Sequence, residues 1–267
     1  MKTMLVLSMG ALLLAGTLSA QTPVPEWQAG VDKMKSLIQT NPAQASEEVG
    51  ELLKEKNKKN VDLVTSVAHV YLDAGKITEA QEYLAMAKKA NNKDPKVSVL
   101  EGDIALAQKN IGQACQLYEQ AIYFDPNCKE AYLKYAQAYK SASPTQAIEK
   151  LEQLKAVDPN CLEADRELAE VYYSGNRFGK AAEMYAKFID TPLATEDDML
   201  KYAFALFLNH DFEKSLQVAQ KGLQKNARHA AFNRLVMYNN TDLKRYEDAE
   251  KAADAFFNAS DRADYSY

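Results

Sequence analysis

Apolar residues recur every three or four positions in two stretches of the segment 61–90, and a glycine separates the stretches. These positions fall on one face of a helix in each stretch: Val64, Val67, Ala68 and Tyr71, then Ala80, Leu84 and Ala87. Gly75, between them, can adopt the left-handed conformation that ends a helix. The segment therefore predicts a helical hairpin, which needs neighbours to bury its apolar face.

The same pattern returns along the chain at a spacing close to thirty-four residues. The second-stretch positions recur as Ala114, Tyr118 and Ala121; Ala147, Leu151 and Leu154; Ala181, Tyr185 and Phe188; Ser215, Ala219 and Gly222; and Ala249, Ala253 and Phe256. Small residues allow close approach of two helices, and large residues fill the space around the contact. In the first stretch the small residue at Ala68 and the large residue at Tyr71 also recur. Met237 departs from the small series, and Ala105 and Asn240 depart from the large one. A period of this length predicts an all-α solenoid with repeats starting near residues 61, 95, 129, 162, 196 and 230.

One copy carries the repeat pattern almost complete, in Gly102, Ile111, Ala114, Tyr118, Ala121 and Asp125–Pro126. This pattern resembles the tetratricopeptide repeat family, and the resemblance covers nearly all of the chain after residue 26. It implies a right-handed superhelical solenoid of antiparallel helix pairs with about seven repeats. Residues 21–60 are then a lead-in and a divergent first repeat, in which Trp27 is expected to cover the open apolar end. Residues 61–263 form six further repeats.

The first twenty residues predict a secretory signal peptide, with an uncleaved anchor as the alternative. Lys2 precedes an apolar run from Met4 to Leu14, and Ser19–Ala20 forms a small-residue cleavage site before Gln21. No later apolar run is long enough to span a bilayer. We therefore expect a periplasmic or secreted protein without a transmembrane segment after signal removal.

The other end of the chain has two interpretations. Residues 264–267 are spaced as the start of a further repeat, which would make the chain the N-terminal part of a longer array. Alternatively, the last helical stretch is itself the cap, because Asp248, Glu250, Lys251 and Asp254 give it a polar outer side.

Composition and motifs narrow the function classes. The net charge of −5 and the pI near 5.4 argue against nucleic-acid binding, which needs a basic surface. The three histidines are scattered, and no metal-ligand, phosphate-loop or nucleophile motif occurs. Cys128 and Cys161 occupy equivalent repeat positions, about 10 Å apart, which is too far for a disulfide limited to about 7 Å. We expect no catalytic residue, no metal, no cofactor and no enzyme activity.

The family resemblance also implies where a partner binds. In this family the first helix of each repeat lines the concave wall, and in the sixth repeat here four of five wall positions are large and apolar. A wall that met only solvent would not select such residues. With their neighbours, the candidate partner-binding residues are Arg166, Glu170, Tyr173, Leu200, Phe204, Phe207, Arg234 and Tyr238. Alternatively, the curl of the superhelix buries Phe204 and Phe207 between repeats.

These observations predict a non-catalytic protein–protein interaction scaffold of the cell envelope that binds a protein or peptide segment in its concave groove. The Lys and Asn clamp that family members use for a C-terminal carboxylate does not occur at these wall positions, so we assign no such ligand. The alternative is an accessory or substrate-binding subunit of a larger envelope protein or complex. The identity of the partner and the oligomeric state are left open.

Overall fold

The structure, a computed structural model, describes residues 24–54 and 57–259. Within these ranges the chain forms fourteen α-helices and no strand. The helices follow one another as seven pairs: α1 (Gln28–Leu37) and α2 (Pro42–Leu52), α3 (Val61–Asp73) and α4 (Ile77–Asn91), α5 (Pro95–Ala107) and α6 (Ile111–Phe124), α7 (Lys129–Tyr139) and α8 (Pro144–Val157), α9 (Leu162–Ser174) and α10 (Phe178–Phe188), α11 (Glu196–Leu208) and α12 (Phe212–Lys225), and α13 (Ala230–Asp242) and α14 (Tyr246–Ala259). The expected all-α solenoid is confirmed. The expected signal peptide and residues 264–267 lie outside the described residues.

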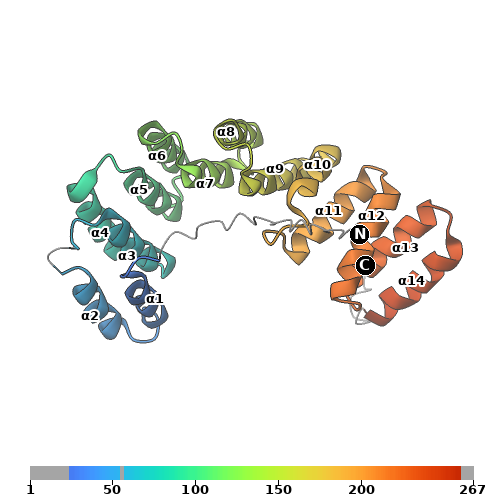
Figure 1. Ribbon diagram of the computed structural model, residues 1–267, viewed down its shortest axis with the longest axis horizontal. Coiled ribbons are helices and arrows are strands. Elements are labelled where there is room, and N and C mark those ends of the chain that lie inside the picture. The colour runs from blue at the N-terminus through green and yellow to red at the C-terminus, as the bar shows by residue number, and fades with distance from the viewer. Residues whose placement is uncertain (1–23, 55–56, 260–267) are drawn as a thin grey trace, which may run out of the picture.

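The pairs stack into an arch (Figure 1), with α5, α7 and α9 on its inner side and α6 and α8 on its outer side. Each second helix packs against the first helix of the next pair, from α4 on α5 to α12 on α13. First helices also contact one another directly, as α3 does with α5 and α11 with α13. The first helices therefore line the inner wall, with the loosest approach between α9 and α11.

Short polar sequences start the helices. Asn60 and Asn110 accept a hydrogen bond from the amide three residues on, and Thr195 forms a capping box with Asp198. Three helices, α2, α5 and α8, begin with proline. Proline has no amide hydrogen, and at the first position of a helix an amide hydrogen would have no acceptor within the helix.

The turn inside five of the pairs has one residue in the left-handed conformation. These residues have φ between 57° and 75°: Gly75, Lys109, Asn176, His210 and Lys244. In each turn the next amide donates to the carbonyl five residues back, as Lys76 does to Tyr71 over 2.9 Å. His210 takes the place of Gly75, so the turn geometry is kept even where glycine is absent.

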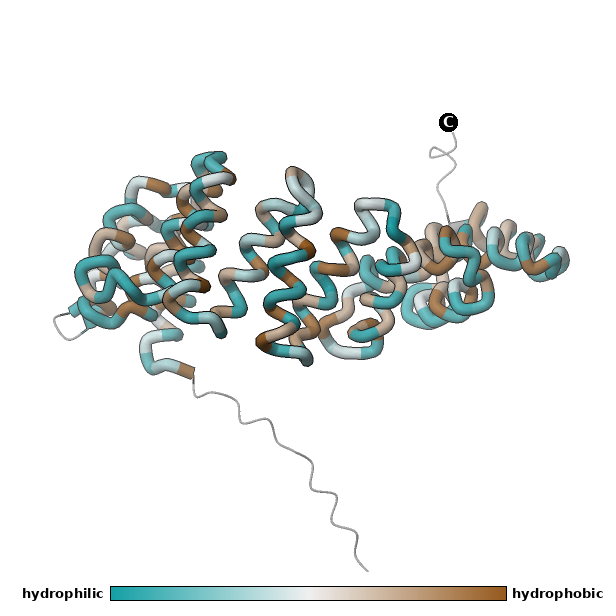
Figure 2. The backbone as a smooth tube through the Cα atoms, turned by 90° about the horizontal axis from the view of Figure 1, so that it is seen from above, coloured by the Kyte–Doolittle hydropathy of each residue, from teal (hydrophilic) through white to brown (hydrophobic). Residues whose placement is uncertain are grey.

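The core is a chain of clusters along the array rather than one centre. Figure 2 shows apolar and polar residues alternating along the helices, as expected for amphipathic elements. The small residues at the helix contacts, including Ala80 and Ala114, are fully buried. A Cβ atom added to Gly102 would stand 2.5 Å from the Tyr118 ring, so only glycine allows this approach of α5 and α6.

Two details bear on the sequence predictions. Cys115 is buried, and all three cysteines are free thiols. Trp27 lines a pocket of about 300 Å³ together with Thr65 and His69 of α3 and Val99 of α5. It therefore lies at the inner wall, where it packs against the N-terminal core cluster, and its covering of the open end of the array stays a prediction.

Candidate protein-binding groove

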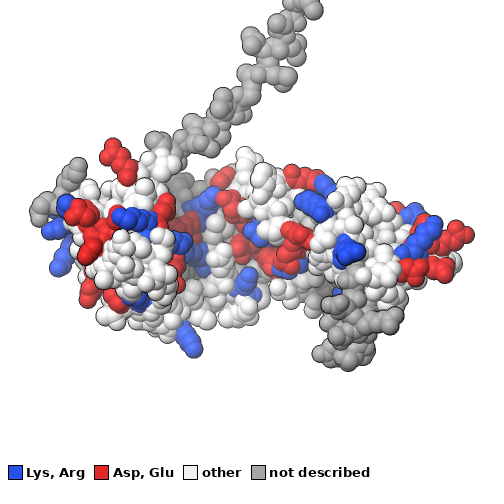
Figure 3. Space-filling view, turned by 90° about the horizontal axis from the view of Figure 1, so that it is seen from below, with Lys and Arg blue, Asp and Glu red and all other residues white. Residues whose placement is uncertain are grey.

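Ion pairs between successive first helices tie the inner wall together. The partners stand about one repeat apart in sequence: Lys129 Nζ lies 2.8 Å from Glu163 Oε1, and His229 Nε2 lies 3.2 Å from Glu196 Oε1. In Figure 3, which views the molecule from below the arch of Figure 1, basic and acidic side chains are interspersed. Because Lys129 and His229 each already have a carboxylate beside them, these contacts leave little for a charged partner to gain there.

Asp103 of α5 is the most highly connected of these groups. It accepts from Tyr118 Oη at 2.7 Å and contacts His69 Nε2 at 3.0 Å and Lys134 Nζ at 2.8 Å. Burial alone would raise the pKa of this carboxyl, but the interactions with His69, Lys134 and Tyr118 outweigh it and hold the pKa of Asp103 below its ordinary value. One carboxylate thus joins α3, α5, α6 and α7.

Two of the candidate binding residues take part in the same kind of bridge. Arg166 of α9 donates from Nε to Asp198 Oδ1 over 3.1 Å, and its Nη2 lies 3.0 Å from Oδ2 of the same carboxylate, which is 1% exposed. Glu170 accepts from Lys201 Nζ at 3.0 Å and from Tyr185 Oη at 2.9 Å. These long side chains join α9 to α11, which approach each other less closely than other neighbouring first helices. Arg166 and Glu170 are therefore partnered within the protein.

The apolar candidates gather on α11 and α13. Leu200, Phe204 and Phe207 are half-buried, and the Phe207 ring centroid lies 5.9 Å from that of Tyr238. Tyr238 itself is 40% exposed. Neighbouring repeats thus cover these rings without burying them fully, so the alternative of burial between repeats holds only in part, and partner binding stays a prediction. We call Leu200, Phe204, Phe207, Arg234 and Tyr238 the α11–α13 patch.

Tyr173 stands apart from this patch on α9. Its ring packs edge-on against Phe178 at a centroid distance of 5.7 Å, and burial raises the pKa of its hydroxyl. It lines the same wall one repeat earlier.

Arg234 is the unusual member of the patch. Its guanidinium carbon lies 5.9 Å from the centroid of the Phe204 ring, a cation–π arrangement. Its Nε is buried and has no hydrogen-bond partner among the described residues. The other wall cations described above face carboxylates, whereas Arg234 faces an aromatic ring and the groove.

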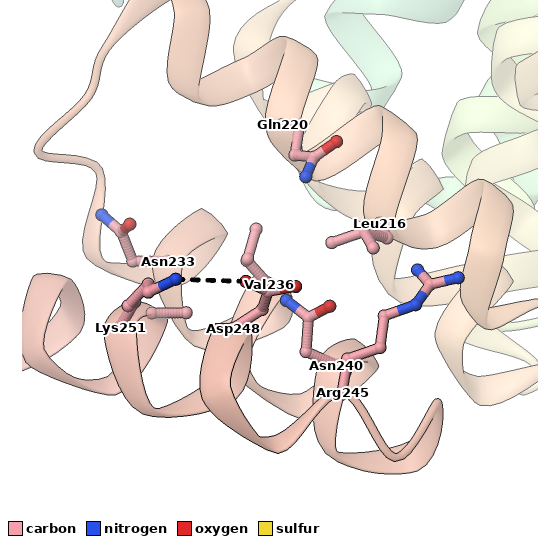
Figure 4. A pocket seen from close by; sticks show the side chains of 9 residues that line it. Leu216, Gln220, Asn233, Val236, Asn240, Arg245, Asp248 and Lys251 are labelled. Carbon is pink, nitrogen blue, oxygen red and sulfur yellow. Dashed lines mark ion pairs between the residues drawn. The ribbon is translucent and has the colours of Figure 1, made fainter.

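A second pocket was missed by sequence reasoning. It measures about 560 Å³ and lies between α12, α13 and α14 (Figure 4), away from the wall positions. The signal that could have revealed it was Asn240, which breaks a series of large residues formed by Tyr71, Tyr139, Tyr172 and Leu206.

Within residues 24–54 and 57–259, no group of three or more His, Cys, Asp or Glu side chains is arranged to hold a metal ion. None of the helices in these ranges combines the length and the apolar character required to cross a bilayer.

The chain is similar to known repeat proteins in sequence and in shape. The tetratricopeptide repeat family model matches residues 68–131 and 137–194. No curated protein matched the chain. Among solved structures, PilW, a widely conserved type IV pilus biogenesis factor, aligns with a TM-score of 0.59 and 17% identity over 76% of this chain and 94% of PilW. A tetratricopeptide repeat protein from Parabacteroides merdae aligns with a TM-score of 0.53 and 16% identity over 90% of this chain and 93% of that one.

YrrB, described as a tetratricopeptide repeat protein with an unusual peptide-binding site, aligns with a TM-score of 0.51 and 13% identity, over 68% of this chain and 94% of YrrB. At these identities the structural relatives show the fold alone. The family match shows tetratricopeptide repeats in residues 68–131 and 137–194, and the seven stacked helix pairs, whose turns and small contact residues repeat in register, continue the same fold on both sides of this region.

Proposed function

We propose that this protein is a non-catalytic scaffold of the cell envelope that binds a segment of a partner protein in its concave groove. The proposal rests on one observation, the α11–α13 patch, which exposes aromatic surface beside an arginine without an acidic partner among the described residues. Tyr, Phe and Arg are the residue types that dominate binding energy once a partner removes water from them.

The chemistry of the patch indicates the chemistry of the partner. Phe204, Phe207 and Tyr238 offer apolar surface for aliphatic or aromatic side chains, and Arg234 can receive a carboxylate while its face rests on Phe204. A segment with an apolar side chain near an aspartate or glutamate satisfies both. YrrB, a tetratricopeptide repeat protein, has a peptide-binding site according to its description, which supports a peptide ligand for this fold.

An envelope location is part of the proposal. It is supported by the signal-peptide pattern of residues 1–20 and by the similarity to PilW, a pilus biogenesis factor. N-terminal sequencing of the protein recovered from its own host should begin at Gln21, in a periplasmic or culture-medium fraction. Recovery from the cytoplasm with Met1 or Lys2 intact would contradict it.

Site-specific photocrosslinking tests the groove. A photoreactive phenylalanine placed at position 207 in living cells should capture a defined partner protein. The same group placed at Tyr123 is the matched control, because that ring is 82% exposed but lies on α6, on the outer side of the arch. The partner should not be captured from position 123.

Purified components then test the energetics. Phe204→Ala combined with Phe207→Ala should weaken partner binding by about 2 kcal/mol or more, because both rings lose contact area in a desolvated pocket. Arg234→Glu should weaken it further through repulsion of the acidic side chain. A folded triple variant that binds the partner as tightly as the parent would remove the patch from consideration.

A further inference from the structure

The polar pocket at the C-terminal end of the described array is built by two exceptions to the repeat. Asn233 and Asn240 of α13 stand where α11 has Met199 and Leu206, both buried apolar residues. The equivalent space between α10, α11 and α12 is a pocket of about 260 Å³ lined by Met199 and Tyr202, whereas this one measures about 560 Å³. Two asparagines have thus replaced side chains that fill the gap in the preceding repeat.

Asn240 has unused hydrogen-bonding capacity. Its side chain is 4% exposed and makes no hydrogen bond to any residue of the described ranges. Figure 4 shows its amide directed into the space below Leu216 and Gln220 of α12. In the open pocket this amide is free to bond a ligand, which a leucine at this place could not do.

Asn233 supplies a second group at the other end of the pocket. It is also 4% exposed, and its Nδ2 donates to the carbonyls of Ala227 at 3.1 Å and His229 at 3.3 Å. Its Oδ1 accepts no hydrogen bond from a described residue. The pocket therefore offers one acceptor at Asn233 and both a donor and an acceptor at Asn240.

The charges around the pocket are balanced. Arg245 Nη2 lies 3.2 Å from Glu213 Oε1, and Lys251 Nζ lies 3.6 Å from Asp248 Oδ1, the pair marked in Figure 4. Each cation has its own carboxylate. A ligand with net charge gains little here, whereas a neutral ligand with donors and acceptors matches the amides.

The spacing of the two asparagines fits a peptide. Seven residues of helix separate them, which is about 10 Å at 1.5 Å per residue, and about three residues of extended chain cover that distance. None of the described residues that line the pocket is aromatic, so among them the flat apolar face of a sugar finds no platform. We propose that this pocket binds a short, uncharged, extended peptide segment through its main-chain amides, independently of the concave groove.

Nuclear magnetic resonance on the full chain can test the pocket directly. The probe is acetyl-tetraalanine amide at millimolar concentration, and the readout is the side-chain amide signals of Asn233, Asn240 and Gln220. These signals should shift in a saturable way. The same peptide with methylated main-chain nitrogens should bind at least about tenfold more weakly, because it has lost its main-chain hydrogen-bond donors.

Three variants complete the test. Asn240→Leu restores the side chain found at Leu206, so it should fold at least as stably as the parent and lose the peptide response. Phe207→Ala alters the groove and should leave the peptide response intact, which separates this site from the proposed function. Gln116→Leu, on the exposed face of α6, should behave as the parent.

Absence of a saturable shift at Asn240, or an equal shift with the methylated peptide, would overturn the proposal. So would a response to an N-acetylglucosamine trisaccharide without one to the peptide, which would make the pocket a carbohydrate site. Retention of the peptide response by Asn240→Leu would show that the peptide binds elsewhere.

Discussion

At the scale of single residues, the repeat depends on backbone conformation at the turn and on side-chain size at the helix contact. The left-handed turn position is occupied by glycine once and by lysine, asparagine or histidine in four other turns. Such a conformation costs a residue with a Cβ atom about 1–2 kcal/mol. The surrounding helix packing therefore imposes a geometry that four of these residues do not prefer.

We expect Gly75→Ala to lower stability by about 1 kcal/mol, because alanine must adopt φ near 75° at a site where its Cβ would otherwise meet no atom within 4 Å. Lys109→Gly should instead raise the stability, by a smaller amount, since glycine also gains conformational freedom in the unfolded chain. Urea unfolding midpoints measure both. Equal shifts in the same direction would contradict the turn assignment.

Size at the helix contact gives a second residue-scale test. Ala114 is fully buried, so Ala114→Leu should lower stability by about 1–3 kcal/mol through overpacking. Gln116→Leu introduces the same side chain on the exposed face of the same helix and should change stability little. Thermal unfolding of the two variants side by side decides whether α6 has the orientation described.

At the scale of helices, Asp103 shows how one buried carboxylate couples several elements. Its pKa is lowered in the folded protein, so its contribution to stability is present above its ordinary value of 3.8 and is lost as the pH falls from there through the folded-state value. Its neighbours supply the hydrogen bonds that favour the charged form, and they belong to three different helices.

Asp103→Asn should therefore destabilise the array by about 1–3 kcal/mol at neutral pH, since the charged hydrogen bonds to Lys134 and His69 are lost. The difference from the parent should shrink as the pH falls from 3.8 towards the lower folded-state pKa, because the parent carboxyl gains its proton first in the unfolded chain and then in the folded one. Melting temperatures of both proteins between pH 7 and pH 3 provide the measurement. A difference independent of pH would show that the carboxylate charge is unimportant.

At the scale of the whole molecule, the array is quasi-one-dimensional, so each pair is stabilised mainly by its neighbours. Among the described helices, α14 packs mainly on α13, whereas α6 packs on both α5 and α7. We expect the amides of α14 to exchange with solvent much faster than those of α6. Hydrogen exchange followed by mass spectrometry measures this, and equal protection of the two helices would contradict the one-dimensional description.

The amino-acid sequence alone determined the helix pairs, their all-α arrangement and the identity of the close-contact residues. The reason is that a period of thirty-four residues repeats the same local requirements many times, so a departure in one copy, such as Ala105, does not hide the pattern. The register in which the resemblance places the wall positions agrees with the bounds of α11, and their use as a binding surface stays a prediction.

Only the tertiary structure decided how the wall side chains are used. Arg166 and Glu170 have the same character in sequence as Arg234, yet they bridge α9 and α11 while Arg234 has no carboxylate partner in the described chain. The tertiary structure likewise decided that Trp27 reaches the inner wall and that Asn240 faces a pocket. Contacts between repeats depend on the distance and angle between neighbouring pairs, and these follow from the packing of many residues at once rather than from the periodicity of any one segment.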